Sequence, residues 1–78
     1  MRQDIKDTIA RLRYERDKFK AMSTQRRKDA TEYRKARRWL DALKAMERCR
    51  EYRDIAARNQ VEIDRLKRAY TMPKEPAA

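Results

Sequence analysis

The fold of this chain depends most on the stretch STQRRKDATE, Ser23–Glu32. Its first three residues, serine, threonine and glutamine, form the one cluster of weaker helix formers inside the chain. Asp29 and Glu32 have the D-x-x-E spacing of a capping box, a pattern that can start a new helix. We therefore expect the chain to turn at about residues 23–28.

Glycine and proline are both missing from Met1 to Met72. Without them the chain has few ways to form a tight turn or a bulge, so nearly all of it is expected to be helical. The missing glycine also argues against the turn itself, because about a third to a half of helices end on a left-handed residue that is usually glycine. One unbroken helix therefore remains an alternative to a hairpin.

Apolar residues recur at helical spacing on both sides of the expected turn. Before the turn, this pattern predicts a helix at about residues 3–22. After it, the pattern predicts a helix at about residues 29–71, and Pro73 ends that helix because proline disfavours the helical conformation of the residue before it. The expected organisation is one helical domain, residues 1–72, followed by an extended tail at residues 73–78.

The expected second helix has two apolar faces. Tyr33, Ala36, Trp39, Leu40, Leu43 and Met46 fall on one face, and Cys49, Tyr52, Ile55, Ala56, Ile63, Leu66 and Tyr70 fall on nearly the opposite face. At 1.5 Å per residue the first helix is about 30 Å long and the second about 64 Å, so the first cannot cover the second. A break at residues 47–51, which would give three helices, is the alternative to one long helix with two partners.

The first helix is expected to pack on the first of these faces, at residues 33–46, and a second copy of the chain is the expected partner for the second face, at residues 49–70. Only ten residues are Leu, Ile, Val or Phe, which leaves a thin core for a domain of 78 residues. The expected fold class is all-α, a hairpin of a short and a long helix that forms a coiled-coil-like or four-helix homodimer. The expected dimer interface consists of Tyr52, Ile55, Ala56, Ile63, Leu66 and Tyr70.

The net charge of +10 favours an acidic partner. Half of this excess lies in residues 23–40, which contain seven basic and two acidic residues. The candidate binding residues in this stretch are Arg26, Arg27, Lys28, Arg34, Lys35, Arg37, Arg38 and Trp39. Arginine and tryptophan are common anchors in protein interfaces, and arginine is also suited to phosphate groups.

Composition argues against catalysis and against several kinds of ligand. Histidine is absent, so there is no imidazole base, and without glycine there is no phosphate-binding loop of the usual kinds. We expect no enzyme activity, no cofactor, no metal site and no small-molecule substrate. No apolar run is long enough for a membrane span or a secretory signal, and Cys49 has no second cysteine to pair with, so a cytoplasmic location is expected.

These features predict a small interaction protein, such as a regulator, an inhibitor or an assembly factor of the phage type. In this interpretation a basic helical face binds an acidic surface of another protein. The alternative is a protein that binds DNA or RNA without sequence preference through residues 26–38. Protein binding is favoured because many of the basic residues alternate with acidic ones, which makes a poor track for phosphates.

Overall fold

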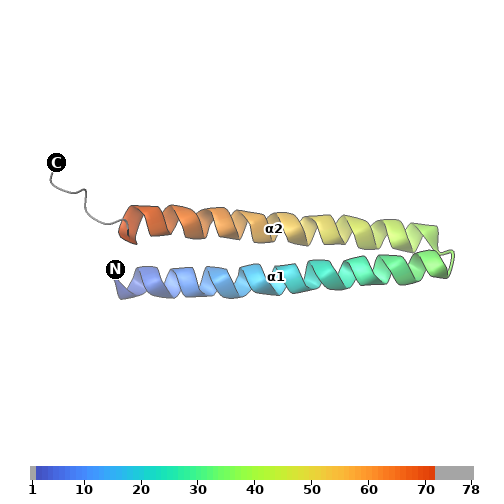
Figure 1. The fold of residues 1–78 in the computed structure, drawn as a ribbon, viewed down its shortest axis with the longest axis horizontal. Coiled ribbons are helices and arrows are strands. Elements are labelled where there is room, and N and C mark those ends of the chain that lie inside the picture. Colours follow the sequence, from blue (N-terminus) through green and yellow to red (C-terminus); the bar gives the residue numbers. More distant parts are fainter. Residues whose placement is uncertain (1, 72–78) are drawn as a thin grey trace.

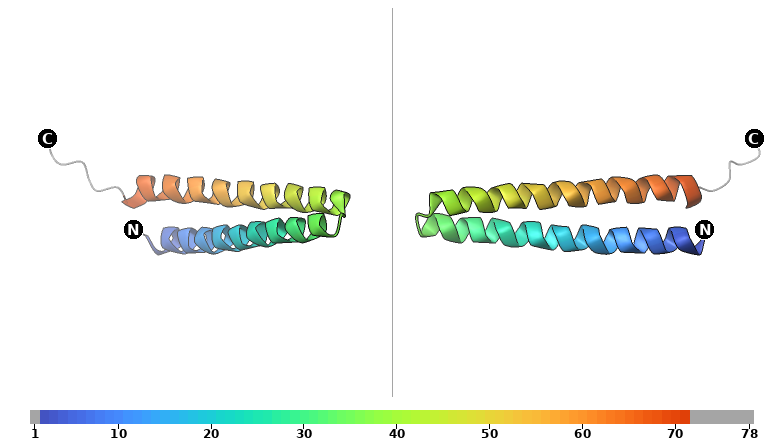
Figure 2. Two further views of the ribbon diagram at one scale, coloured as in Figure 1. Left: turned by 45° about the vertical axis from the view of Figure 1, so that its right-hand side comes forward. Right: turned by 180° about the vertical axis from the view of Figure 1, so that it is seen from behind.

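Two antiparallel helices of equal length make up the fold (Figure 1). The computed structural model describes residues 2–71, with helix α1 at Gln3–Lys35 and helix α2 at Trp39–Thr71. In all views the helices lie side by side, so that the start of α1 and the end of α2 share one end of the hairpin (Figure 2). The predicted all-helical hairpin is confirmed. The predicted tail at residues 73–78 lies outside the described residues.

The predicted position of the turn is wrong. The chain reverses at residues 36–38, and Ser23 lies in the middle of α1. Ser23 is buried against α2, where its hydroxyl donates a hydrogen bond to the Cys49 carbonyl at 3.0 Å. Asp29 does not cap a helix, because it also lies inside α1. Its carboxylate accepts a hydrogen bond from the Gln25 side chain one turn earlier, at 3.0 Å. Tertiary packing therefore keeps this polar stretch helical.

The turn uses arginine where glycine is usual. Arg37 has φ of 59°, the left-handed conformation that commonly follows the end of a helix. Its N–H donates to the Arg34 carbonyl at 3.0 Å, and the Arg38 N–H donates to the Tyr33 carbonyl at 2.8 Å, which together form a Schellman motif. The Arg38 guanidinium also lies 5.0 Å from the centre of the Tyr33 ring. This cation–π contact stands where such motifs usually have an apolar contact.

The helices meet along a seam whose positions are spaced alternately by three and four residues, as in a coiled coil. The buried or half-buried seam positions are Ile5, Ile9, Leu12, Arg16, Phe19, Ser23, Ala30 and Tyr33 in α1, and Ala42, Ala45, Cys49, Tyr52, Ala56, Asn59, Ile63 and Leu66 in α2. Arg26 completes the series in α1 and is exposed. Since polar residues and alanines fill much of this seam, an apolar pattern reveals it only in part.

The seam also corrects the expected partner of residues 49–70. Ala56, Ile63 and Leu66 are buried within the single chain, and the Tyr52 ring lies 5.8 Å from the Phe19 ring. Ile55 is half-buried, and Tyr70 is exposed. Because α1 is longer than expected, it covers the face that seemed to need a second copy, so we do not propose these six residues as a dimer interface.

Candidate functional site

Three large apolar residues lie on the outside of the hairpin next to the turn. Trp39, Leu40 and Leu43 are 64%, 72% and 57% exposed, and we call them the outer patch. On a helix, Leu40 and Leu43 point away from Ala42 and Ala45, which are buried against α1, whereas Trp39 precedes Ala42 by three residues and lies beside the seam. The sequence pattern had assigned the outer patch to packing on the first helix, and the structure corrects this assignment.

Basic side chains surround the turn end. Within residues 2–71, Arg34, Arg37 and Lys44 form no salt bridge, and we call these three the unpaired cations. Lys44 follows Leu40 by one helical turn, so these two side chains are neighbours on α2. An apolar surface beside cations that have no internal partner is therefore the main exposed feature of this end.

The predicted binding residues separate into two groups in the structure. Arg34, Lys35, Arg37, Arg38 and Trp39 come together at the turn end, where Lys35 pairs with Glu32 at 3.5 Å and Arg38 pairs with Asp41 at 2.6 Å. Arg26, Arg27 and Lys28 lie about two turns earlier on α1.

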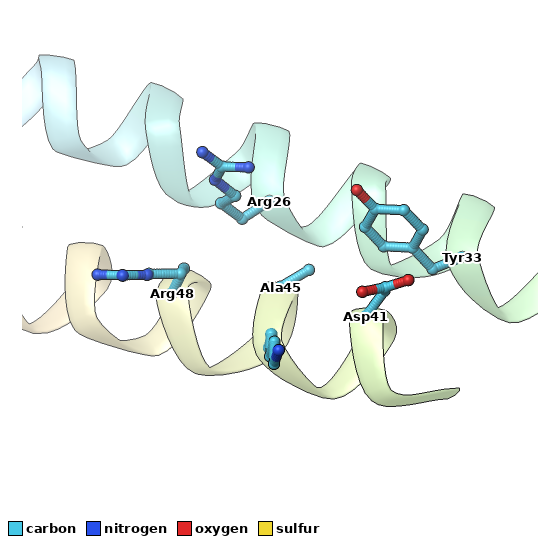
Figure 3. A pocket seen from close by; sticks show the side chains of 6 residues that line it. Arg26, Tyr33, Asp41, Ala45 and Arg48 are labelled. Carbon is cyan, nitrogen blue, oxygen red and sulfur yellow. The ribbon is translucent and has the colours of Figure 1, made fainter. Parts of the chain in front are cut away.

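A shallow hollow of about 240 Å³ lies between the helices near the turn (Figure 3). Its lining residues are Arg26 and Tyr33 from α1, and Asp41, Lys44, Ala45 and Arg48 from α2. Three of these side chains are cationic and one is acidic. Sequence reasoning missed Lys44 and Arg48, because only the pairing of the helices places them opposite Arg26.

The middle of the hairpin contains a buried polar contact. Besides donating to the Cys49 carbonyl, the Ser23 hydroxyl lies 3.2 Å from the Cys49 sulfur. When the thiol is ionised, the hydroxyl can turn its single proton to the sulfur, and this contact with Ser23 lowers the pKa of the Cys49 thiol. Burial opposes the shift, and the Arg53 guanidinium, 3.7 Å from the sulfur, adds to it. Cys49 is completely buried, so its sulfur is closed to solutes and belongs to the core.

Metal binding and membrane insertion find little support in the described structure. Residues 2–71 contain no group of three histidine, cysteine or acidic side chains arranged to hold a metal ion. Over the same residues, neither helix combines the length and the apolar character needed to cross a lipid bilayer. Several of the surface carboxylates pair with arginine: Arg16 lowers the pKa of Asp17, and Arg65 lowers the pKa of Glu62.

Comparison with protein-family models, with curated proteins and with solved structures finds nothing that matches this chain. The function must therefore be argued from the surface itself. The two features that the fold leaves unexplained are the outer patch and the hollow, and both lie at the turn end.

Proposed function

We propose that this protein is a non-enzymatic interaction module that binds an acidic partner protein through its turn end. The outer patch enters an apolar groove of the partner, and the unpaired cations meet carboxylates around that groove. The observation that carries this proposal is the exposure of Leu40 and Leu43 on the side of α2 that faces away from the seam, with Trp39 exposed one turn before Leu43.

The apolar contact supplies the affinity in this proposal. Burying a large apolar side chain is worth about 1.5–3 kcal/mol. Tryptophan and arginine are the residues most often found at the energetic centre of protein interfaces. A helix that places residues three and four positions apart in a groove is a common mode of recognition. Leu43 follows Leu40 by three positions and Trp39 by four.

The charge distribution favours an acidic partner over a second copy of this chain. Residues 23–53 contain eleven basic and five acidic side chains, so two turn ends brought together would repel each other. The same charges would accelerate association with an acidic surface. A homodimer formed through the outer patch would therefore have to overcome a repulsion that an acidic partner does not meet.

Nucleic-acid binding is the competing function, and Arg27 and Lys28 favour it. Within the described residues both side chains are exposed and neither forms a salt bridge. They lie on α1, away from the outer patch. A phosphate backbone is charged and would not make apolar contacts with the exposed side chains of Leu40 and Leu43. The exposed apolar residues thus support protein binding more directly than DNA or RNA binding.

Site-specific photocrosslinking tests the proposal. The photoreactive residue p-benzoylphenylalanine replaces Trp39 in one protein and Tyr14 in a matched control, because Tyr14 is also an exposed aromatic residue but lies far from the turn. We expect a discrete protein adduct from position 39 alone. That partner is then purified, and its affinity for this protein is measured by calorimetry.

Two variants of the outer patch decide the outcome. Leu40→Asp and Leu43→Asp should each weaken binding to the purified partner at least tenfold, while Val61→Asp, an exposed apolar position on the other half of α2, should not. Circular dichroism checks that all variants remain helical. Unchanged affinity of the Leu40 and Leu43 variants would contradict the proposal, and so would salt-sensitive binding to duplex DNA or RNA that is tighter than binding to any protein. Self-crosslinking from position 39 would identify a homodimer instead.

A further inference from the structure

We propose that the hollow between the helices receives one carboxylate side chain of the partner protein. This inference rests on the proposed function and names the chemistry of one contact within it. The hollow adjoins the outer patch, because Lys44 lines the hollow and Leu40 lies one turn earlier on the same helix. A protein seated on the outer patch can therefore place an acidic residue in the hollow.

The hollow offers hydrogen-bond donors that the hairpin does not use. Within residues 2–71, neither the Lys44 ammonium nor the Tyr33 hydroxyl has a hydrogen-bond partner. The Tyr33 ring runs back along α1, and its hydroxyl points away from Asp41 (Figure 3). A carboxylate accepts hydrogen bonds without donating any, which is what these groups require.

The two arginines of the hollow also keep most of their donors. Arg26 Nη1 lies 3.4 Å from Asp29, and Arg48 Nη1 lies 3.3 Å from Glu51, so each makes one long contact. A guanidinium has five N–H donors, and bidentate contact with a carboxylate is shorter and stronger than these contacts. Arg26 comes from α1 and Arg48 from α2, so each helix contributes one guanidinium to the lining of the hollow (Figure 3).

Asp41 decides between a carboxylate and a phosphomonoester. Its side chain lines the hollow, and its Oδ2 lies 2.6 Å from Arg38 Nη2. A phosphomonoester carries up to two negative charges and would meet more repulsion from Asp41 than a carboxylate with one charge. The contacts therefore favour an aspartate or glutamate side chain over a phosphomonoester. Each phosphate of a nucleic-acid backbone carries one charge, as a carboxylate does, so Asp41 does not discriminate between these two groups.

Nuclear magnetic resonance can test the hollow without the partner. Hexaglutamate is titrated into ¹⁵N-labelled protein while the Nε–Hε signals of the arginines are recorded. We expect saturable shifts at Arg26 and Arg48 that exceed those of the other arginines. The double variant Arg26→Gln/Arg48→Gln should weaken hexaglutamate binding at least fivefold. The matched control is Arg11→Gln/Arg58→Gln, which removes the same charge from exposed arginines outside the hollow and should bind like the original protein.

Two further titrations distinguish the source of the negative charge. Inorganic phosphate and hexathymidylate are added at the same concentrations and ionic strength as hexaglutamate. Tighter binding of either phosphate compound would overturn the carboxylate assignment, as would equal shifts at all arginines or an unchanged affinity of the double variant. If hexaglutamate fails while Leu40→Asp still weakens the purified partner's binding, only this inference falls. If hexaglutamate binds the hollow but the outer-patch variants leave the partner's binding unchanged, the proposed function falls.

Discussion

The two halves of the hairpin differ in the size of the apolar side chains that they bury. In the half that contains the chain ends, Ile9, Ile63 and Leu66 are buried in the seam. In the turn half, the buried apolar residues of the seam are the alanines at positions 30, 42 and 45 and Cys49, while large apolar residues of α2 lie outside. Burial of a small side chain removes less apolar surface from water. The half with the chain ends thus buries more apolar surface in the seam. Both halves expose large apolar residues, and in the turn half these are Trp39, Leu40 and Leu43, which lie close together on α2.

The largest effect on stability is expected from Ile63→Ala in the half with the chain ends. Ile63 is 0% exposed and packs in the cluster with Ile9 and Leu66. We expect a loss of about 3 kcal/mol in the free energy of unfolding, since large-to-small changes in a core cost about 2–5 kcal/mol. Urea denaturation followed by circular dichroism measures it. A loss below about 1 kcal/mol would mean that this half does not carry the stability.

A smaller effect is expected from Ser23→Ala at the junction of the halves. The variant loses the hydrogen bond to the Cys49 carbonyl, which costs about 1 kcal/mol at neutral pH. It also removes the main group that lowers the pKa of the Cys49 thiol, so that pKa should rise. The thiol can be followed by ultraviolet absorbance of the thiolate.

The stability of the two proteins should diverge as the pH rises. A thiol with a lowered pKa in the folded state stabilises the fold above the pKa of the unfolded thiol, and this contribution is lost as the pH falls through the folded pKa. The free energy of unfolding of the original protein should therefore rise relative to that of Ser23→Ala between neutral pH and about pH 9. A difference that stays constant over this range would show that Ser23 does not act on the thiolate.

Arg37→Gly should make the turn slightly more stable. A left-handed conformation costs a residue with a side chain about 1–2 kcal/mol, and glycine at position 37 removes this cost. Part of this gain in stability is offset, because glycine is more flexible in the unfolded chain. The expected net gain is about 0.5 kcal/mol, measured as a higher Tm. Arg34→Gly serves as the control, since it lies inside α1 and should lower the Tm. Equal effects of the two glycines would argue against the turn at residues 36–38.

The smallest effect on folding is expected from Leu43→Ala in the outer patch. Leu43 is exposed, and alanine forms helix as readily as leucine, so the free energy of unfolding should change by less than about 0.5 kcal/mol. The same chemical-denaturation measurement as for Ile63→Ala gives the comparison directly. A loss similar to that of Ile63→Ala would show that the outer patch is part of the core after all.

The helical fold could be predicted from the sequence, but the position of the turn could not. The absence of glycine and proline up to Met72 indicates helix without any knowledge of packing. The turn could not be located in the same way, because Arg37 takes the left-handed conformation and no local sequence pattern predicts it there. Ser23, in contrast, has a turn-like local sequence and is kept in a helix by its contact with Cys49 across the seam.

The candidate site could be predicted only in part, because some of its features are local to the sequence and others depend on how the helices pair. A local excess of arginine around Trp39 is visible in the sequence, and it points to the end of the hairpin where the outer patch lies. Lys44 and Arg48 belong to the same region only because α2 folds back along α1. The apolar stripe that contains Leu40 and Leu43 is also visible in the sequence. The sequence pattern predicts that these two residues are buried, but the structure shows them exposed.

The sequence by itself determined that this protein is helical and basic, because backbone propensity and charge are properties of the residues themselves. The tertiary structure decided where the chain turns, which apolar face becomes the seam and which stays outside. That choice depends on how two helices of equal length cover each other, with alanines and Cys49 turned inward near the turn. Only this pairing leaves Trp39, Leu40 and Leu43 in contact with water.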